Sequence, residues 1–297
     1  MATPLAIDSK VTLRSGHKLP VLGFGLWQST APFESALEAL RVGYRHLDSA
    51  RVYRNEDKTA AAVQQSGVKG VFLTSKLTCK DYARASTSAA VTDSISKAAS
   101  SNAQWSLYLL HDPCGGRQKR IEAWRELERM QQEGSLKAIG VSNFVSRDSG
   151  PEPSRLLTPV SKSEKHLQQL VDDGASVIPD VNQIELHPWC QQKPIVEYCI
   201  KHNIVVEAYC PIVRGTKWED PTLQSVAKST GRTPAQVLLR WSLQKGYVPI
   251  VKSDTPARIK ENTQIFDFEL SPKDMQALDS LDQGRGGACS WNPVHVD

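Results

Sequence analysis

Short β-rich runs alternate with longer amphipathic patterns along the chain of 297 residues, and this alternation constrains the fold more than any other feature. Helical spacing of apolar residues is clearest over 33–42, 121–132 and 234–244. Alternating βα units favour a parallel sheet, and eight of them predict a closed (β/α)8 barrel, here a single domain over 1–297. The predicted strands are 21–27, 46–49, 72–76, 106–111, 138–143, 181–186, 205–210 and 248–253.

A doubly wound sheet that binds dinucleotides is the main rival fold. Such a sheet carries a G-x-G-x-x-G turn after its first strand. Here Gly23 and Gly25 are present, but Gln28 stands at the third glycine position, which favours the barrel. Ahead of the first predicted strand, residues 11–20 contain a Ser-Gly turn and predict an N-terminal β-hairpin that could plug the barrel.

Charge and cysteine content exclude several classes of function. The 36 Lys and Arg residues against 32 Asp and Glu give a net charge of +4, so neither nucleic acid nor a membrane surface is expected as a partner. No apolar run is long enough to span a membrane and no secretory leader is recognised, which predicts a cytoplasmic protein. The six cysteines form neither a C-x-x-C pair nor a cluster with zinc spacing, so no metal site is expected.

Polar side chains stand at the ends of three successive predicted strands. The second strand ends near Asp48, with Tyr53 in the following loop; the third ends at Lys76 and the fourth at His111. Because barrel enzymes build their active sites at the carboxyl ends of the strands, these four are expected to converge. A phenol becomes more acidic beside an ammonium, so Lys76 is expected to lower the pKa of Tyr53 and make it a proton donor. Taken singly, each residue type is more often structural.

Several segments of the chain match the sequence motifs of a known family, in the same order. In one-letter code they include LGFGLW (22–27), GYRHLDSA (43–50), IGVSNF (139–144) and VNQIELHP (181–188). The chain therefore resembles the aldo-keto reductases, in particular fungal and bacterial reductases of small carbonyl compounds or keto-sugars. The resemblance implies reduction of an aldehyde or ketone to an alcohol. It implies that Tyr53 is the acid, that Lys76 and Asp48 tune it, and that His111 orients the carbonyl.

The resemblance also implies NADP(H) as cofactor, bound in an extended form. Three side chains are expected to hold the carboxamide of the nicotinamide: Ser142, Asn143 and Gln183. Tyr209 is expected to stack on the nicotinamide ring and so fix the face that delivers hydride.

A second group of polar residues is expected at the other end of the cofactor. Lys252, Ser253 and Arg258 would hold the 2′-phosphate, which needs paired cations. Asn262 would contact the adenine. Asp254 departs from the neutral residue usual in the family, and its charge would repel a 2′-phosphate, so the preference for NADPH over NADH stays open.

Tryptophans set the expectations for the substrate pocket. Trp27 is expected to wall the pocket together with His111, while Trp218 and Trp291 could line its open side or only pack the loop and tail. Val213 stands where the family has glycine, so the contacts of that loop with the phosphates also stay open.

Two other classes of function remain. One is a redox-sensing protein on the same fold that binds NADP(H) with little turnover, like the β subunits of potassium channels. The other is an unrelated barrel hydrolase or lyase, against which count the lack of a metal set and of paired carboxylates at strand ends. The chain is expected to act as a monomer on a small carbonyl substrate.

One stretch, residues 145–162, does not fit the pattern. It has three prolines and no apolar period, so it predicts a loop inserted after the fifth strand. When it is deleted, the residues on either side join into a sequence that is normal for the family. Its 18 codons can also carry the signals of a short in-frame intron. We hypothesise a retained intron, with a genuine insertion as the rival, and sequencing the cDNA decides between them.

Overall fold

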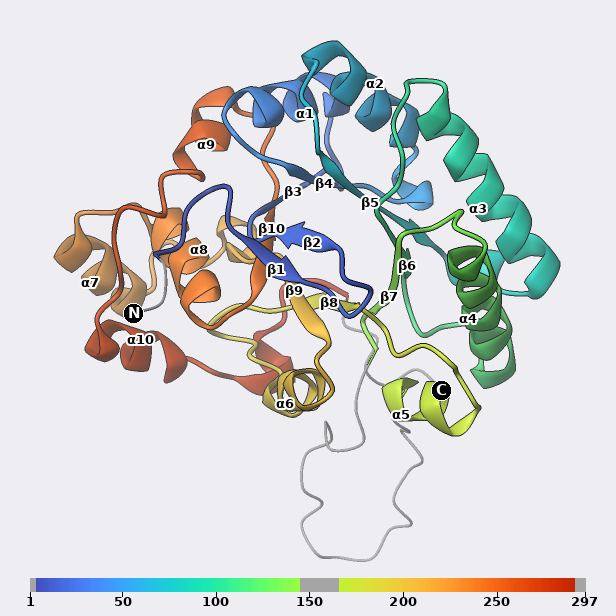
Figure 1. Cartoon of the computed structure of the whole chain (residues 1–297). Coiled ribbons are helices and arrows are strands. Elements are labelled where there is room, and N and C mark those ends of the chain that lie inside the picture. Colours follow the sequence, from blue (N-terminus) through green and yellow to red (C-terminus); the bar gives the residue numbers. More distant parts are fainter. Residues whose placement is uncertain (1–3, 145–165, 292–297) are drawn as a thin grey trace, which may run out of the picture.

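Eight parallel strands close into a barrel in the computed structural model, which describes residues 4–144 and 166–291 (Figure 1). The strands follow one another around the barrel in chain order, and β10 completes the ring between β9 and β3. Each strand coincides with one predicted run to within a few residues, which confirms the (β/α)8 fold. The strands are β3 (Gly23–Gly25), β4 (His46–Asp48), β5 (Phe72–Leu77), β6 (Leu107–Leu110), β7 (Ala138–Ser142), β8 (Val181–Glu185), β9 (Val205–Tyr209) and β10 (Val248–Val251).

Helices surround the barrel on its outer face (Figure 1). The helices predicted over 33–42, 121–132 and 234–244 are present as α1, α4 and α8. The start of α8 is fixed by a capping box of Thr233 and Gln236, and α2 ends at Gly67, whose φ of 66° suits glycine. The helices are α1 (Pro32–Arg41), α2 (Glu56–Ser66), α3 (Arg84–Ala99), α4 (Arg117–Gln132), α5 (His166–Asp172), α6 (Lys193–Lys201), α7 (Pro221–Thr230), α8 (Pro234–Gln244), α9 (Pro256–Glu261) and α10 (Pro272–Asp279).

An antiparallel hairpin of β1 (Lys10–Thr12) and β2 (Lys18–Pro20) crosses in front of the barrel strands in Figure 1. Its Leu13 and Leu19 are buried in one cluster with barrel side chains such as Leu107. The predicted hairpin is therefore confirmed, and its apolar side chains pack against the barrel as a plug should.

The register of the parallel strands brings polar residues to one end of the barrel. Asp48 at the end of β4 lies opposite Thr74 of β5, and Lys76, two residues further along β5, lies opposite Leu109 of β6. Neighbouring parallel strands present their carboxyl ends at the same edge. His111, which directly follows β6, therefore belongs to the same edge as Asp48 and Lys76.

The stretch 145–162 lies outside the described residues, so the expected loop insertion and the intron hypothesis both stay predictions. Among the helices described over 4–144 and 166–291, none is both long and apolar enough to cross a membrane.

Candidate active site

The four polar residues predicted at strand ends meet at one point. Tyr53 reaches it from a short 3₁₀ turn (Arg51–Tyr53) that follows β4. Lys76 Nζ lies 2.5 Å from Asp48 Oδ1 and 3.4 Å from Tyr53 Oη. Tyr53 Oη in turn lies 3.4 Å from His111 Nε2. A phenolic oxygen is thus held between an ammonium and an imidazole.

Burial controls the protonation of this cluster. Burial raises the pKa of Tyr53 well above its usual value, and the charge of Asp48 raises it further. The pKa of Tyr53 is therefore above, not below, that of a free tyrosine, because burial has the largest effect on it. The expected lowering of this pKa by Lys76 stays a prediction. Burial, helped by Lys76, lowers the pKa of His111 to about 3, so its imidazole is neutral at physiological pH.

A buried amide links the cluster to a second carboxyl group that the sequence analysis missed. Gln183 Nε2 donates to Asp48 Oδ2 at 2.9 Å and to Glu207 Oε2 at 2.7 Å. Burial and the neighbouring Asp48 raise the pKa of Glu207 to about 8. Glu207 lies in the middle of β9 and is joined to Asp48 only through Gln183, so it is not one of the paired strand-end carboxylates considered for a hydrolase. Glu207 escaped notice because it lies inside β9 and faces a partner distant in the chain.

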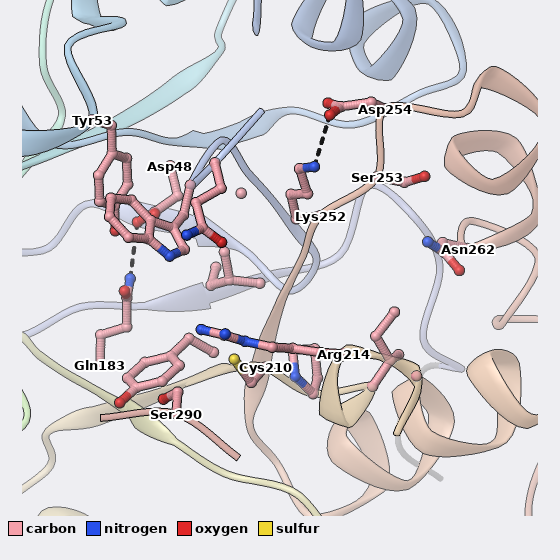
Figure 2. Close-up of a pocket in the computed structure, with 18 of the residues that line it drawn as sticks. Asp48, Tyr53, Gln183, Cys210, Arg214, Lys252, Ser253, Asp254, Asn262 and Ser290 are labelled. Atoms are coloured by element: carbon pink, nitrogen blue, oxygen red, sulfur yellow. Dashed lines mark hydrogen bonds and ion pairs between the residues drawn. The ribbon is translucent and has the colours of Figure 1, made fainter. Parts of the chain in front are cut away.

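Glu207 cannot act as a catalytic carboxylate of a hydrolase. Its side chain has no exposed surface, so it cannot touch a substrate. It is buried in the barrel, where Gln183 connects it to Asp48. Figure 2 shows the bond between Gln183 and Asp48.

One large cleft of about 1110 Å³ opens above the cluster. The predicted residues that line it are Trp27, Asp48, Tyr53, His111, Ser142, Asn143, Gln183, Tyr209, Lys252, Ser253, Arg258 and Asn262. Only Lys76 is missing from this set, because it is fully buried and reaches Tyr53 from the barrel interior. Trp218 and Trp291 also line the cleft, so both contribute to its wall.

The part of the cleft next to the cluster carries amide and hydroxyl groups. Asn143 follows β7 with a left-handed φ of 62°; its Nδ2 donates to the carbonyl oxygen of His111 at 3.2 Å. Its Oδ1 accepts from Tyr209 Oη at 2.8 Å. Ser142 Oγ donates to the carbonyl oxygen of Gln183 at 2.8 Å. Within the described chain no hydrogen bond uses Gln183 Oε1, so this oxygen is available to an amide ligand.

The far part of the cleft carries cations. Figure 2 shows Lys252, Ser253 and Asn262 along its wall, away from Tyr53. Arg258 is exposed and forms no ion pair with any residue that the structure describes. Lys252, by contrast, is paired: its Nζ lies 2.7 Å from Asp254 Oδ2. Cations and donors gathered in this way fit a phosphate group, although Asp254 reduces the positive charge.

A strained loop after β9 adds an arginine that the sequence analysis did not assign. Cys210, Val213 and Arg214 have left-handed φ angles of 50°, 50° and 51°. Such backbone is unfavourable for β-branched residues above all, which explains why glycine suits the position of Val213. Figure 2 shows Arg214 beside Cys210 in the cleft. A hydrogen bond from Cys289 and then the guanidinium of Arg214 lower the pKa of the Cys210 thiol, although burial opposes this.

The C-terminal segment forms one side of the cleft. Glu185, the last residue of β8, accepts from the backbone nitrogens of Cys289 and Ser290 at 2.5 and 3.1 Å, and from Ser290 Oγ at 2.6 Å. Tyr209 Oη lies 3.2 Å from the carbonyl oxygen of Trp291. One buried carboxylate therefore anchors the segment that brings Trp291 to the cleft.

Among the residues that the structure describes, two groups of potential metal ligands have ligand atoms within 4.8 Å of one another: Cys79, Asp112 and Cys114, and Glu185, His187 and Cys289. Cysteine and histidine spacing could not reveal them, because their members come from separate loops and strands. In the second group the carboxylate of Glu185 already accepts hydrogen bonds from the C-terminal segment and lies 2.9 Å from His187 Nε2, which identifies it as a structural anchor.

Comparison with known proteins shows the class and the family. Residues 21–283 match the family model described as "Aldo/keto reductase family". An uncharacterized oxidoreductase of Schizosaccharomyces pombe is 38% identical over 97% of this chain and 98% of its own length. Glyoxal reductase of Bacillus subtilis is 35% identical over 94% of this chain and 95% of its own. A solved structure of a Gox0644 mutant in complex with NADPH, 33% identical, superposes with a TM-score of 0.85 over 98% of this chain and 99% of that one.

The barrel and these relatives define an oxidoreductase. The chain belongs to the aldo/keto reductase family.

Proposed function

We propose that the protein reduces aldehydes and ketones to alcohols with NADPH, and that Tyr53 supplies the proton. The observation that carries this proposal is the position of Tyr53 Oη, 3.4 Å from both Lys76 Nζ and His111 Nε2, in the lining of the cleft. A hydroxyl placed between a cation and a neutral imidazole suits protonation of a carbonyl oxygen on which negative charge develops.

The chain's own groups orient the carbonyl and move one proton. When bound, NADPH supplies the hydride that reaches the carbonyl carbon. The neutral imidazole of His111 can donate a hydrogen bond from Nε2 to the carbonyl oxygen and polarise it. Tyr53 Oη gives its proton to that oxygen, and the ammonium of Lys76 stabilises the phenolate that is left. Asp48, 2.5 Å from Lys76 Nζ, keeps the lysine charged and in place.

The polar parts of the cleft fit the two ends of NADP(H). The proposed contacts of the nicotinamide are Ser142, Asn143, Gln183 and Tyr209. The proposed contacts of the adenosine 2′-phosphate are Lys252, Ser253, Arg258 and Asn262. Gln183 Oε1, which accepts no hydrogen bond from a described residue, suits the amide hydrogens of a carboxamide. The guanidinium of Arg258, which pairs with no described carboxylate, suits a phosphate. The Gox0644 mutant structure, which contains NADPH, supports NADPH as the cofactor.

Small aldehydes are the proposed substrates. The ring of Trp27 lies 4.8 Å from the ring of Tyr53, so the proton donor stands beside an aromatic wall. Trp218 and Trp291 add apolar surface on the outer side of the cleft. Glyoxal reduction by the Bacillus relative supports a small carbonyl compound. Because one chain supplies all these groups, we propose that it acts as a single-domain monomer.

A carbonyl panel tests the proposal. The protein is mixed with NADPH and glyoxal, with other small aldehydes, with ketones and with a keto-sugar, and both NADPH loss and alcohol formation are measured. We expect one alcohol per NADPH, with the highest kcat/KM for small aldehydes. A protein that binds NADPH but consumes none with any carbonyl would contradict the proposal and support the redox-sensing alternative.

A further inference from the structure

A carboxylate stands where the proposed 2′-phosphate site calls for positive charge. Asp254 Oδ2 lies 2.7 Å from Lys252 Nζ, and Figure 2 shows this ion pair on the wall of the cleft next to Ser253. Both side chains are partly exposed and both line the cleft. Any group that binds between Lys252 and Arg258 therefore lies next to the ion pair of Lys252 and Asp254.

The carboxylate is held from the opposite side by donors that belong to another part of the chain. Asp254 Oδ1 accepts from Ser29 Oγ at 2.6 Å and from Ser35 Oγ at 3.0 Å, while Oδ2 accepts from the backbone nitrogen of Thr30 at 3.1 Å. These donors lie between β3 and α1 and in the first turn of α1. They do not depend on any nucleotide, so Asp254 stays in place whichever cofactor is bound.

The charge of this carboxylate is permanent at physiological pH. Partial burial opposes ionisation, but the hydrogen bonds from Lys252, Ser29 and Thr30 hold the pKa of Asp254 well below its usual value. Lys252, Arg258 and Asp254 together then present one net positive charge to the cleft, where the two cations alone would present two. A 2′-phosphate carries about two negative charges, so it must share Lys252 with Asp254.

The two cofactors respond differently to a fixed carboxylate. Coulomb repulsion acts on the 2′-phosphate of NADPH. NADH has a neutral 2′-hydroxyl instead, which can donate a hydrogen bond to a carboxylate. Asp254 therefore weakens binding of NADPH and leaves NADH binding unchanged or improved.

We propose that Asp254 is a specificity-determining residue that neutralises Lys252 and lets this enzyme bind NADH within about tenfold of NADPH. The inference rests on the proposed function, because it assigns the cofactor preference of that same site. It goes further by naming the residue that sets this preference.

Binding titrations test the inference without turnover. The dissociation constants of NADPH and NADH are measured by quenching of tryptophan fluorescence for the wild type, Asp254→Asn and the double variant Asp254→Asn/Lys252→Met. We expect Asp254→Asn to bind NADPH about tenfold more tightly and NADH within twofold of the wild type. The single variant Lys252→Met is measured as well. The Lys252→Met change should weaken NADPH binding more in the Asp254→Asn background than in the wild type, since removal of the carboxylate frees the ammonium.

Glu261→Gln provides the matched control. Glu261 also lines the cleft, but its carboxylate accepts from Thr233 Oγ1 and forms no ion pair with Lys252 in the described part of the chain. Its loss should leave the ratio of the two dissociation constants within about twofold, as expected for a screened charge. If Glu261→Gln shifts the ratio as much as Asp254→Asn, general cleft charge sets the preference and the inference is overturned.

Other results separate this inference from the proposed function. Equal changes for NADPH and NADH in Asp254→Asn, or a wild type that binds NADPH over a hundredfold more tightly than NADH, would overturn the inference alone. A wild type that binds neither nucleotide would overturn both. Thermal melts check folding, and Asp254→Ser, which keeps a hydroxyl acceptor for Ser29, replaces the Asn variant if that one unfolds.

Discussion

At the scale of single residues, the buried groups under the cleft leave one ammonium balanced by one carboxylate. Burial and the nearby Lys76 lower the pKa of His46 to about 3, so this histidine is neutral although its Nε2 lies 3.8 Å from Glu207 Oε1. The pKa of Glu207, raised to about 8, keeps that carboxyl protonated at neutral pH. Asp48 and Lys76 then carry the only full charges of the network, which favours a lysine held ready to stabilise a phenolate.

Glu207→Gln should change how stability depends on pH. The pKa of Glu207 is about 8 in the folded protein and near 4.5 when unfolded, so the group stabilises the fold at low pH and loses this contribution as pH rises towards 8. The loss reaches a few kcal/mol, at about 1.4 kcal/mol per unit of pKa shift. Glutamine copies the protonated form, so urea unfolding at pH 5 and pH 9 should show the variant gaining on the wild type as pH rises. Parallel pH profiles would contradict the assigned protonation.

Arg258→Ala should weaken NADPH binding by tenfold or more, since it removes the one cation of the proposed phosphate site that no described carboxylate neutralises. NADH binding should stay within about twofold. Lys252→Ala should act in the same direction but less strongly, because Lys252 is already paired with Asp254. Titration of both nucleotides checks the prediction, and equal losses for the two would argue against a phosphate at this position.

At the scale of elements, the barrel strands were predictable but the docking of the C-terminal segment was not. The strands can be recognised in the sequence as short apolar runs between helical patterns. The segment is held by Glu185 and by a close approach, in which a Cβ at Gly287 would lie 1.8 Å from the carbonyl oxygen of Trp189. Both contacts join parts of the chain that are distant in sequence, so no local pattern reveals them.

Gly287→Ala should displace this segment and leave the barrel folded. The new methyl group has no space, so the hydrogen bonds from Cys289 and Ser290 to Glu185 should break. We expect faster proteolysis near the C-terminus, a melting temperature lower by a few degrees and weaker NADPH binding. Gly286→Ala is the control, because a Cβ there meets nothing within 4 Å. Identical proteolysis of the two variants would show that the close approach does not hold the segment.

At the scale of the whole molecule, the order of apolar runs and strand-end polar residues was enough to predict the barrel and the meeting of Tyr53 with Lys76 and His111. Protonation could not be predicted in the same way, since it depends on how much water the fold removes. The sequence suggested that Lys76 makes Tyr53 more acidic, whereas burial makes it less acidic. The pairing of Glu207 with Asp48 through Gln183 was likewise hidden, because only the closed barrel brings these strands together.

The measurement that tests the central claim most directly compares Tyr53→Phe with Tyr44→Phe. Tyr44 is a matched control, because its buried hydroxyl has no hydrogen-bond partner within the described chain and lies outside the cleft. In single-turnover oxidation of NADPH by glyoxal, Tyr53→Phe should be slower by roughly a thousandfold, with an NADPH dissociation constant within twofold of the wild type. Tyr44→Phe should react like the wild type. A Tyr53→Phe variant that reduces glyoxal near the wild-type rate would contradict Tyr53 as the proton donor.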